Sequence, residues 1–150
     1  SNEATQKAIK DVLKADYDGS LDPALLPAAV QETEGLESAC LELDAAPSFI
    51  FYVADRETAK SFRFFSDNAP LTFEAKEAED GRVYFKVTTY AYGMLDTVRY
   101  TYTDAAGHSH SGAYNLAAYY AGVSDTTKVL VLALAGYSAS ATAYRNSVIR

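Results

Sequence analysis

The sequence has one cysteine, Cys40, and no tryptophan among its 150 residues. A single thiol excludes an intrachain disulfide and a thiol-rich zinc site. Cys40 lies between Ala39 and Leu41 in an alternating apolar pattern, so we expect a small buried side chain rather than a nucleophile. The lack of disulfides leaves the redox compartment open, because bacterial secreted proteins do not require them.

Basic residues are also scarce, with 13 Lys and Arg against 20 Asp and Glu and a formal net charge of −7. This charge repels a phosphate backbone, so we expect no nucleic-acid partner. The hydrophobic content of 49% and charged content of 22% are typical of a soluble globular protein. A chain of this length fits one domain. We therefore predict a single domain over 1–150, with an N-terminal helix and linker (3–35), an antiparallel β region (36–104) and a C-terminal helical region (113–146).

Long apolar runs are limited to one stretch, 126–144. A helix that spans a membrane needs about 20 predominantly apolar residues. Here the apolar run stops at Gly136 and polar residues follow, so we expect no membrane insertion. Helical spacing places five residues on one broad stripe: Leu130, Leu134, Tyr137, Ala141 and Tyr144. The preferred interpretation is a helix that starts at Asp125 or Thr126 and packs on the core.

Between 36 and 104 the pattern changes to alternation with many Val, Phe, Tyr and Thr residues, which is typical of strands. Candidate strands are 37–43, 48–53, 61–66, 71–78, 82–91 and 97–103. Tight turns at Asp80-Gly81 and at 104–107 favour antiparallel hairpins. Helical spacing is found at 3–13 and at 115–121. The predicted fold class is α+β: an antiparallel β-sandwich or curved sheet of about six to seven strands, with N-terminal and C-terminal helices packed against it.

Several segments resemble a family of accessory modules found in large secreted proteins of Gram-positive, often gut-dwelling, bacteria. These are SFIFYVA (48–54), the segment 87–107, YNLAAYY (114–120), the closing helix at 126–144, and shorter stretches at 5–8 and 21–26. The Asn-Tyr-Gly triplet of that family reads Ala135-Gly136-Tyr137 here. The resemblance implies a non-catalytic module of a secreted or cell-wall-attached protein, with neighbouring domains of the same polypeptide as partners. We expect any secretion signal to lie outside this sequence.

Candidate catalytic and metal-binding motifs are incomplete. His108 and His110 are the only histidines, and no third protein ligand stands near them in sequence. The acidic loop at 15–27 lacks the glycine and glutamate positions of a calcium loop. GYSAS (136–140) lacks the last glycine of a serine-hydrolase elbow, and no histidine follows it. We therefore expect no cofactor, no metal and no enzyme activity, and interpret the histidines as exposed turn residues.

Tyrosine is abundant, with twelve copies. Strand parity allows five of them to share one face of a sheet: Tyr84, Tyr90, Tyr92, Tyr100 and Tyr102. Such a platform can stack on the sugar rings of cell-wall or host glycans, whereas tyrosines on neighbouring strands ordinarily stabilise a sheet. Two functions stay open: a structural or adhesive accessory module, which we favour, and a carbohydrate-binding module that uses the tyrosine face.

Overall fold

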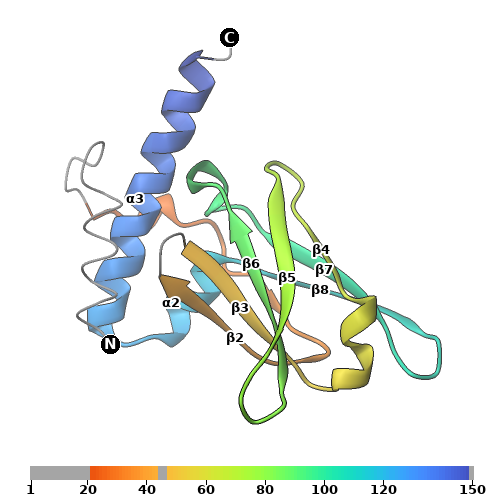
Figure 1. The fold of residues 1–150 in the computed structure, drawn as a ribbon. Coiled ribbons are helices and arrows are strands. Elements are labelled where there is room, and N and C mark those ends of the chain that lie inside the picture. Colours follow the sequence, from red (N-terminus) through yellow and green to blue (C-terminus); the bar gives the residue numbers. More distant parts are fainter. Residues whose placement is uncertain (1–20, 44–46, 149–150) are drawn as a thin grey trace.

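The computed structural model describes residues 21–43 and 47–148, which form two four-stranded antiparallel sheets stacked face to face (Figure 1). One sheet has the order β1 (Gln31–Glu32), β8 (Ser109–Tyr114), β7 (Val98–Thr103) and β4 (Arg63–Phe65). The other has the order β2 (Leu36–Leu43), β3 (Pro47–Val53), β6 (Val83–Thr89) and β5 (Leu71–Glu77). Hairpins join β2 to β3, β5 to β6 and β7 to β8.

The core between the sheets is rich in aromatic rings. Alternation along β3 turns Phe49, Phe51 and Val53 inward, and alternation along β6 does the same for Phe85 and Val87. The opposite sheet contributes a second set of buried residues: Phe64, Val98, Tyr100, Tyr102 and Tyr114. The Phe51 and Phe64 rings stack across the core with centroids 5.4 Å apart. Burial of these rings is the main source of stability for the sandwich.

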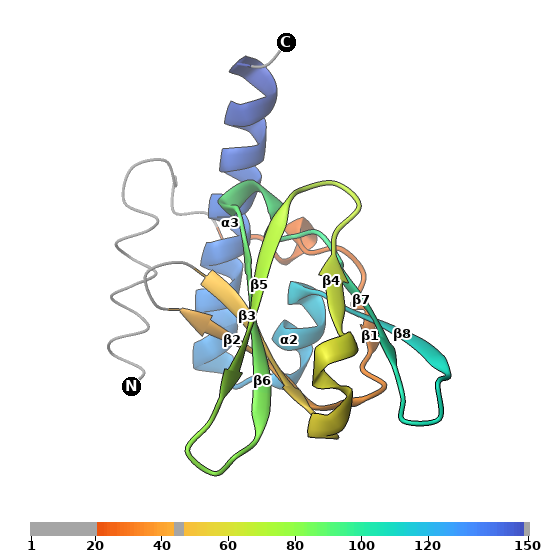
Figure 2. The same cartoon turned by 45° about the vertical axis from the view of Figure 1, so that its right-hand side comes forward.

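Two α-helices close one end of the sandwich, as Figures 1 and 2 show: α2 (Leu116–Gly122) and α3 (Asp125–Val148). The first half of α3 packs on the core through Val131, Leu134 and Ala135. Its second half projects beyond the sheets next to η3 (Ala91–Gly93), a 3-10 turn that follows β6. Two further 3-10 turns are η1 (Pro23–Leu25) and η2 (Arg56–Ser61). In the described part of the chain, no helix is long and apolar enough to cross a bilayer.

The predicted α+β class with an antiparallel, β-rich architecture is confirmed, but the described residues hold eight strands rather than six or seven. The β region continues to Tyr114 rather than ending at 104, because the segment 109–114 pairs with β7 as β8. The helical region predicted at 113–146 therefore begins later, with α2 at Leu116. Strand β1 is only two residues long and is fixed by its pairing with β8. The predicted helix at 3–13 lies outside the described residues, as do the first acidic residues of the loop at 15–27. Asp22, also in that loop, accepts from the Ala24 N–H and caps η1.

The prediction that Cys40 is buried is wrong, because its side chain lies on the exposed outer face of β2. Its neighbours Ala39 and Leu41 pack against the core, so alternation directs Cys40 outward. Partial desolvation, and then the charge of Glu42, raise the pKa of the Cys40 thiol. The thiol is therefore protonated at neutral pH and is a poor nucleophile.

Candidate ligand-binding groove

The five tyrosines of the predicted platform do not share one face. Tyr100 and Tyr102 are buried in the core, with exposed fractions of 0% and 7%. Strand β7 turns both rings inward and leaves Thr101 and Thr103 exposed. The expectation that these two tyrosines present their rings to a ligand is therefore wrong.

Polar contacts explain why tyrosines are accepted in this core. The Tyr100 hydroxyl donates to the backbone carbonyl of Glu34 at 2.5 Å, and the ring of Tyr102 stacks on Phe62 with centroids 4.7 Å apart. Burial raises the pKa of the Tyr100 hydroxyl well above its usual value, so the group stays a donor. Tyr100 thus serves packing and hydrogen bonding inside the sandwich, and Tyr102 serves packing.

Tyr84 lies on the outer face of the other sheet and is half-buried. Its ring packs against Tyr52 at 5.0 Å, and the guanidinium of Arg82 lies 4.4 Å from the centre of the Tyr52 ring. This is a cross-strand aromatic pair, since Tyr52 and Tyr84 are paired in register. It is separate from the positions of the other four tyrosines.

Tyr90 precedes the 3-10 turn η3 and Tyr92 lies within it, and the two rings stack with centroids 5.4 Å apart and an interplanar angle of 11°. Tyr90 is 58% exposed. Helix α3 holds this pair in place: the Arg145 guanidinium lies 4.3 Å from the centre of the Tyr92 ring, and the Thr142 hydroxyl donates to the Tyr92 carbonyl at 3.1 Å. The exposed Tyr90 ring is thus supported by a braced neighbour.

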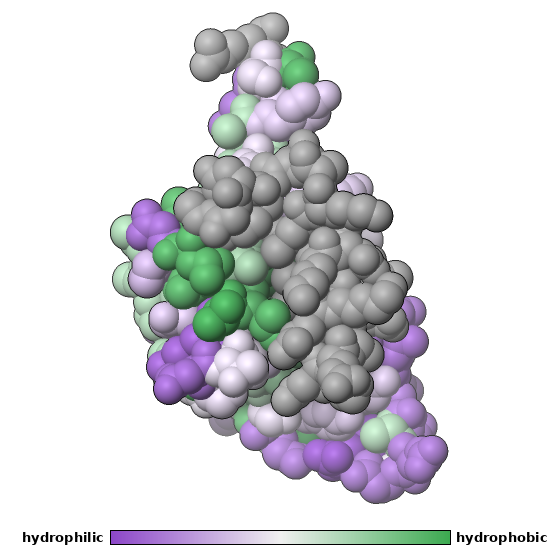
Figure 3. All heavy atoms as spheres, turned by 90° about the vertical axis from the view of Figure 1, so that its left-hand side faces the viewer, coloured by the Kyte–Doolittle hydropathy of each residue, from purple (hydrophilic) through white to green (hydrophobic). Residues whose placement is uncertain are grey.

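A groove of about 590 Å³ lies between η3 and the projecting half of α3. We call it the aromatic groove, and it is lined by Tyr92, Tyr137, Ser140, Ala141, Tyr144, Arg145 and Val148. Tyr144 is 70% exposed. Viewed from the side of α3, the projecting end of the helix stands clear of the body and carries both apolar and polar atoms (Figure 3). The aromatic groove therefore combines exposed rings with one cationic side chain.

Helical spacing predicts that Tyr137 and Tyr144 lie on a stripe that packs on the core, so neither residue was a predicted ligand contact. The stripe packs on the core only along the first part of α3, because the helix continues past the end of the sandwich. Their spacing of seven places both residues on one face of the helix. The spacing of the two tyrosines, with polar residues between them, is the sequence feature that could have indicated an exposed face of the helix.

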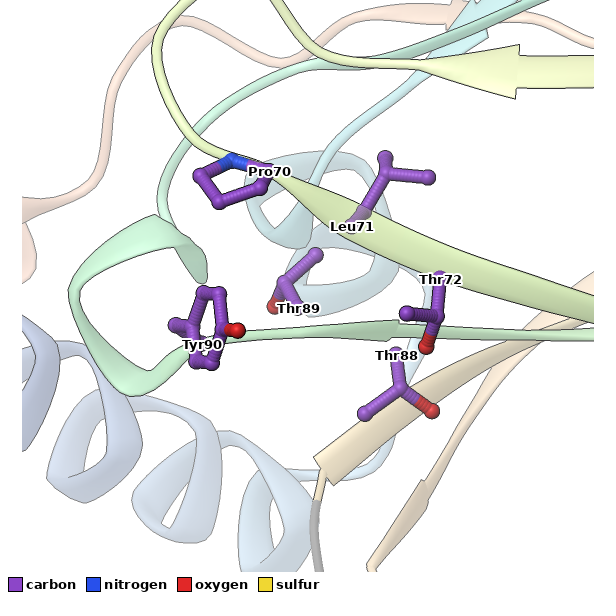
Figure 4. A pocket seen from close by; sticks show the side chains of 6 residues that line it. All are labelled: Pro70, Leu71, Thr72, Thr88, Thr89 and Tyr90. Atoms are coloured by element: carbon purple, nitrogen blue, oxygen red, sulfur yellow. The ribbon is translucent and has the colours of Figure 1, made fainter.

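A smaller pocket of about 110 Å³ lies on the other side of Tyr90 (Figure 4). Its wall consists of Pro70, Leu71, Thr72, Thr88, Thr89 and Tyr90. In Figure 4 Tyr90 stands at one end of this pocket and the side chains of Thr72 and Thr88 at the other. Because Tyr90 stacks on Tyr92, the pocket and the aromatic groove are joined by a continuous pair of rings.

His110 is not the exposed turn residue that we predicted. Its Nε2 lies 2.7 Å from Asp104 and its Nδ1 lies 2.9 Å from Glu34, so two carboxylates bracket the ring. The hydrogen bond to Asp104, and then the charge and hydrogen bond of Glu34, raise the pKa of His110. His108 is exposed, as expected. Over the described residues, no group of three or more His, Cys, Asp and Glu side chains is arranged to hold a metal ion.

Two further polar groups, Ser138 and Asp96, lie outside the aromatic groove. Ser138 of the GYSAS segment is buried in α3, and its hydroxyl has no hydrogen-bond partner among the described residues. Desolvation raises the pKa of Asp96, whose carboxylate accepts long hydrogen bonds of 3.5 Å from Ser66 and Asn68. Neither residue lines the aromatic groove.

No family model, curated protein or solved structure matches this chain. The candidate site therefore rests on the geometry of Tyr90, the aromatic groove and the small pocket alone.

Proposed function

We propose that the protein is a non-catalytic adhesive module of a larger extracellular bacterial protein, and that it recognises glycans through Tyr90 and the aromatic groove. The observation that carries this proposal is the stack of the exposed Tyr90 ring on Tyr92, which Arg145 braces from α3 at the edge of the groove. Rigid, exposed rings are a common means of binding at low conformational cost.

The chemistry of the surface fits a glycan. The apolar C–H face of a sugar ring packs on an exposed tyrosine ring, and Tyr90 and Tyr144 both present one. Arg145 supplies several N–H donors for hydroxyl or carboxylate groups. A volume of about 590 Å³ lies within the range of about 300–1,000 Å³ that is usual for ligand sites. The small pocket next to Tyr90 gives a second place for a ring substituent or a neighbouring sugar.

The proposal differs from the tyrosine face that the sequence predicted. Of the five predicted residues, Tyr90 and Tyr92 belong to this site, and α3 adds Tyr137 and Tyr144. The extracellular location, the neighbouring domains and the lack of catalysis follow from the family resemblance and are part of the proposal. A module that only spaces other domains is the second candidate, favoured by the burial of Tyr100 and Tyr102 in the core.

A glycan and cell-wall-fragment array tests the proposal. We expect the wild-type domain to bind a defined set of glycans, and the Tyr90→Ala and Tyr144→Ala variants to lose that binding while remaining folded, because both side chains are exposed. Tyr84→Ala is the matched control, since Tyr84 lies on a different surface, and it should bind as the wild type does. If the wild type binds no glycan, the spacer function takes the place of this proposal.

A further inference from the structure

Strand β5 (Leu71–Glu77) forms one edge of its sheet, and all but the first of its residues are exposed. It pairs with β6 on one side, and in the described part of the chain no strand pairs with the other side. All residues from Thr72 to Glu77 are exposed, including Phe73, which faces the core side of the sheet. A free edge of this length is an unused template for another strand.

The hairpin turn after β5 fixes which backbone groups are free. The Ala78 N–H donates to the Arg82 carbonyl at 2.8 Å, so Ala78 is bonded toward β6. Along an antiparallel strand, residues bonded to the partner alternate with residues whose N–H and C=O groups point away. Phe73, Ala75 and Glu77 therefore direct their backbone groups to the free edge.

The side chains of β5 are complementary to themselves in the antiparallel direction. If a second β5 is centred on Ala75, each Ala75 faces the other, and the two can exchange both backbone hydrogen bonds. Within one chain Glu74 and Lys76 form an exposed ion pair at 3.4 Å. In this register Glu74 of one copy also lies opposite Lys76 of the other, twice across the two-fold axis, so the four charges alternate in sign. Glu77 lies opposite Phe73, and its charge is already compensated by Arg56 at 3.6 Å.

The other edges of the two sheets lack this property. Strand β2 carries Glu37 and Glu42 and no basic residue. Both carboxylates are paired within the chain, to Arg82 at 3.1 Å and to Lys86 at 3.5 Å, but a second β2 in an antiparallel register offers them no opposite charge of its own. Strands β1 and β4 have only two and three residues. Charged side chains ordinarily block the pairing of edge strands, but on β5 opposite charges meet, although the chain as a whole carries −7.

We propose that β5 is a homodimer interface, at which two copies of this chain pair edge to edge and form one continuous eight-stranded sheet. The two-fold axis of this dimer passes between the two Ala75 residues. The dimer also covers Phe73, whose ring is 37% exposed in the single chain. The residues that pair in this dimer, 73–77, line neither the aromatic groove nor the small pocket, whose only β5 residues are Leu71 and Thr72, so the two proposals can fail separately.

Sedimentation velocity over a concentration series, with a set of charge variants, tests the interface. We expect the wild type to form a species of twice the 16.2 kDa chain mass. Lys76→Glu and Glu74→Lys each place like charges opposite each other twice, and should raise the dimer Kd roughly tenfold or more. The double variant E74K/K76E exchanges the charges and should restore the wild-type Kd.

Two further variants make the test specific. Lys60→Glu changes the net charge as Lys76→Glu does, but at an exposed position on η2, and should leave the dimer intact. Ala75→Pro removes the N–H that faces the free edge and leaves the bonds to β6, so a folded monomer is expected. Three results would overturn the proposal: a monomeric wild type at every concentration, a dimer that both single charge variants leave unchanged, or equal dissociation by Lys60→Glu.

Discussion

Gly112 leaves the space that the ring of Tyr100 fills. The two residues are cross-strand partners on β8 and β7, and a Cβ added to Gly112 would overlap both the Tyr100 ring and the backbone carbonyl of Glu32. The ring crosses over Gly112 and its hydroxyl reaches the carbonyl of Glu34, in the segment that leads into the other sheet. This relationship ties the two sheets together at the edge where β1 pairs.

Gly112→Ala is therefore expected to destabilise the protein by about 2–3 kcal/mol, because the added methyl group must displace a buried ring or a backbone segment. Urea unfolding measures the change in the free energy of unfolding. Gly122→Ala is the control, since nothing lies within 4 Å of a Cβ at that position, and its effect should stay within about 0.5 kcal/mol. Equal stability of the two variants would show that Tyr100 does not occupy the space over Gly112.

Asn115→Ala is expected to lower the free energy of unfolding by about 3 kcal/mol. The Asn115 side chain is 1% exposed and caps α2 by accepting from the Ala118 N–H. It also donates to the Ala28 carbonyl at 2.8 Å and accepts from the Val30 N–H at 3.0 Å, so its loss removes three side-chain hydrogen bonds, one buried and two partly buried. Thermal unfolding and urea unfolding should agree, and a change below about 0.5 kcal/mol contradicts the bonding role of Asn115.

His110 lies between the carboxylates of Asp104 and Glu34, so we expect the stability of the protein to depend on pH. The pKa of His110 is raised above 6.5 in the folded protein, so its contribution is complete below pH 6.5 and is lost as the pH rises through the raised value. The pKa of Asp104 is lowered below 3.8, chiefly by the hydrogen bond to His110, so its contribution is present above pH 3.8 and lost at lower pH. The cluster is thus most stabilising between these two values.

Urea unfolding of the wild type and of His110→Gln over a pH series measures this contribution. The difference in the free energy of unfolding between them should be constant between pH 3.8 and pH 6.5 and shrink both above and below this window. His108→Gln removes an exposed ring whose Nδ1 lies 3.7 Å from Asp104, farther than the 2.7 Å of His110, so its effect should be smaller than that of His110→Gln at every pH. Wild-type and His110→Gln curves that stay parallel across the series would contradict the ion pairs of His110.

The strand at 83–89 could be predicted because Phe85 and Val87 alternate with more polar residues, so a period of two accounts for one buried face. The strand at 47–53 could be predicted because it is a short, nearly continuous apolar run, which the structure buries on both faces. Strand β8 could not be predicted in this way, since its inward positions hold His110, Gly112 and Tyr114 rather than aliphatic residues. Its structure depends on the Tyr100 ring over Gly112, which is a contact between strands.

The candidate site was predictable in part for a similar reason. Tyrosine fits a buried face and an exposed face equally. The sequence therefore allows Tyr90 and Tyr100 to share one face of a sheet, whereas packing against the second sheet buries Tyr100. The contribution of Tyr144 depends on how far α3 extends beyond the sandwich. Packing between elements, rather than the pattern within one element, sets both outcomes.

The central claim is that glycans bind at Tyr90 and the aromatic groove. Its most direct test is an NMR titration of the domain, carrying ¹³C-labelled tyrosine rings, with the glycans that the array selects. We predict that the ring signals of Tyr90, Tyr92 and Tyr144 shift on binding, while those of Tyr52 and Tyr84 on the outer sheet face stay unchanged. Shifts confined to Tyr52 and Tyr84, or no shift of any tyrosine ring, would contradict the account.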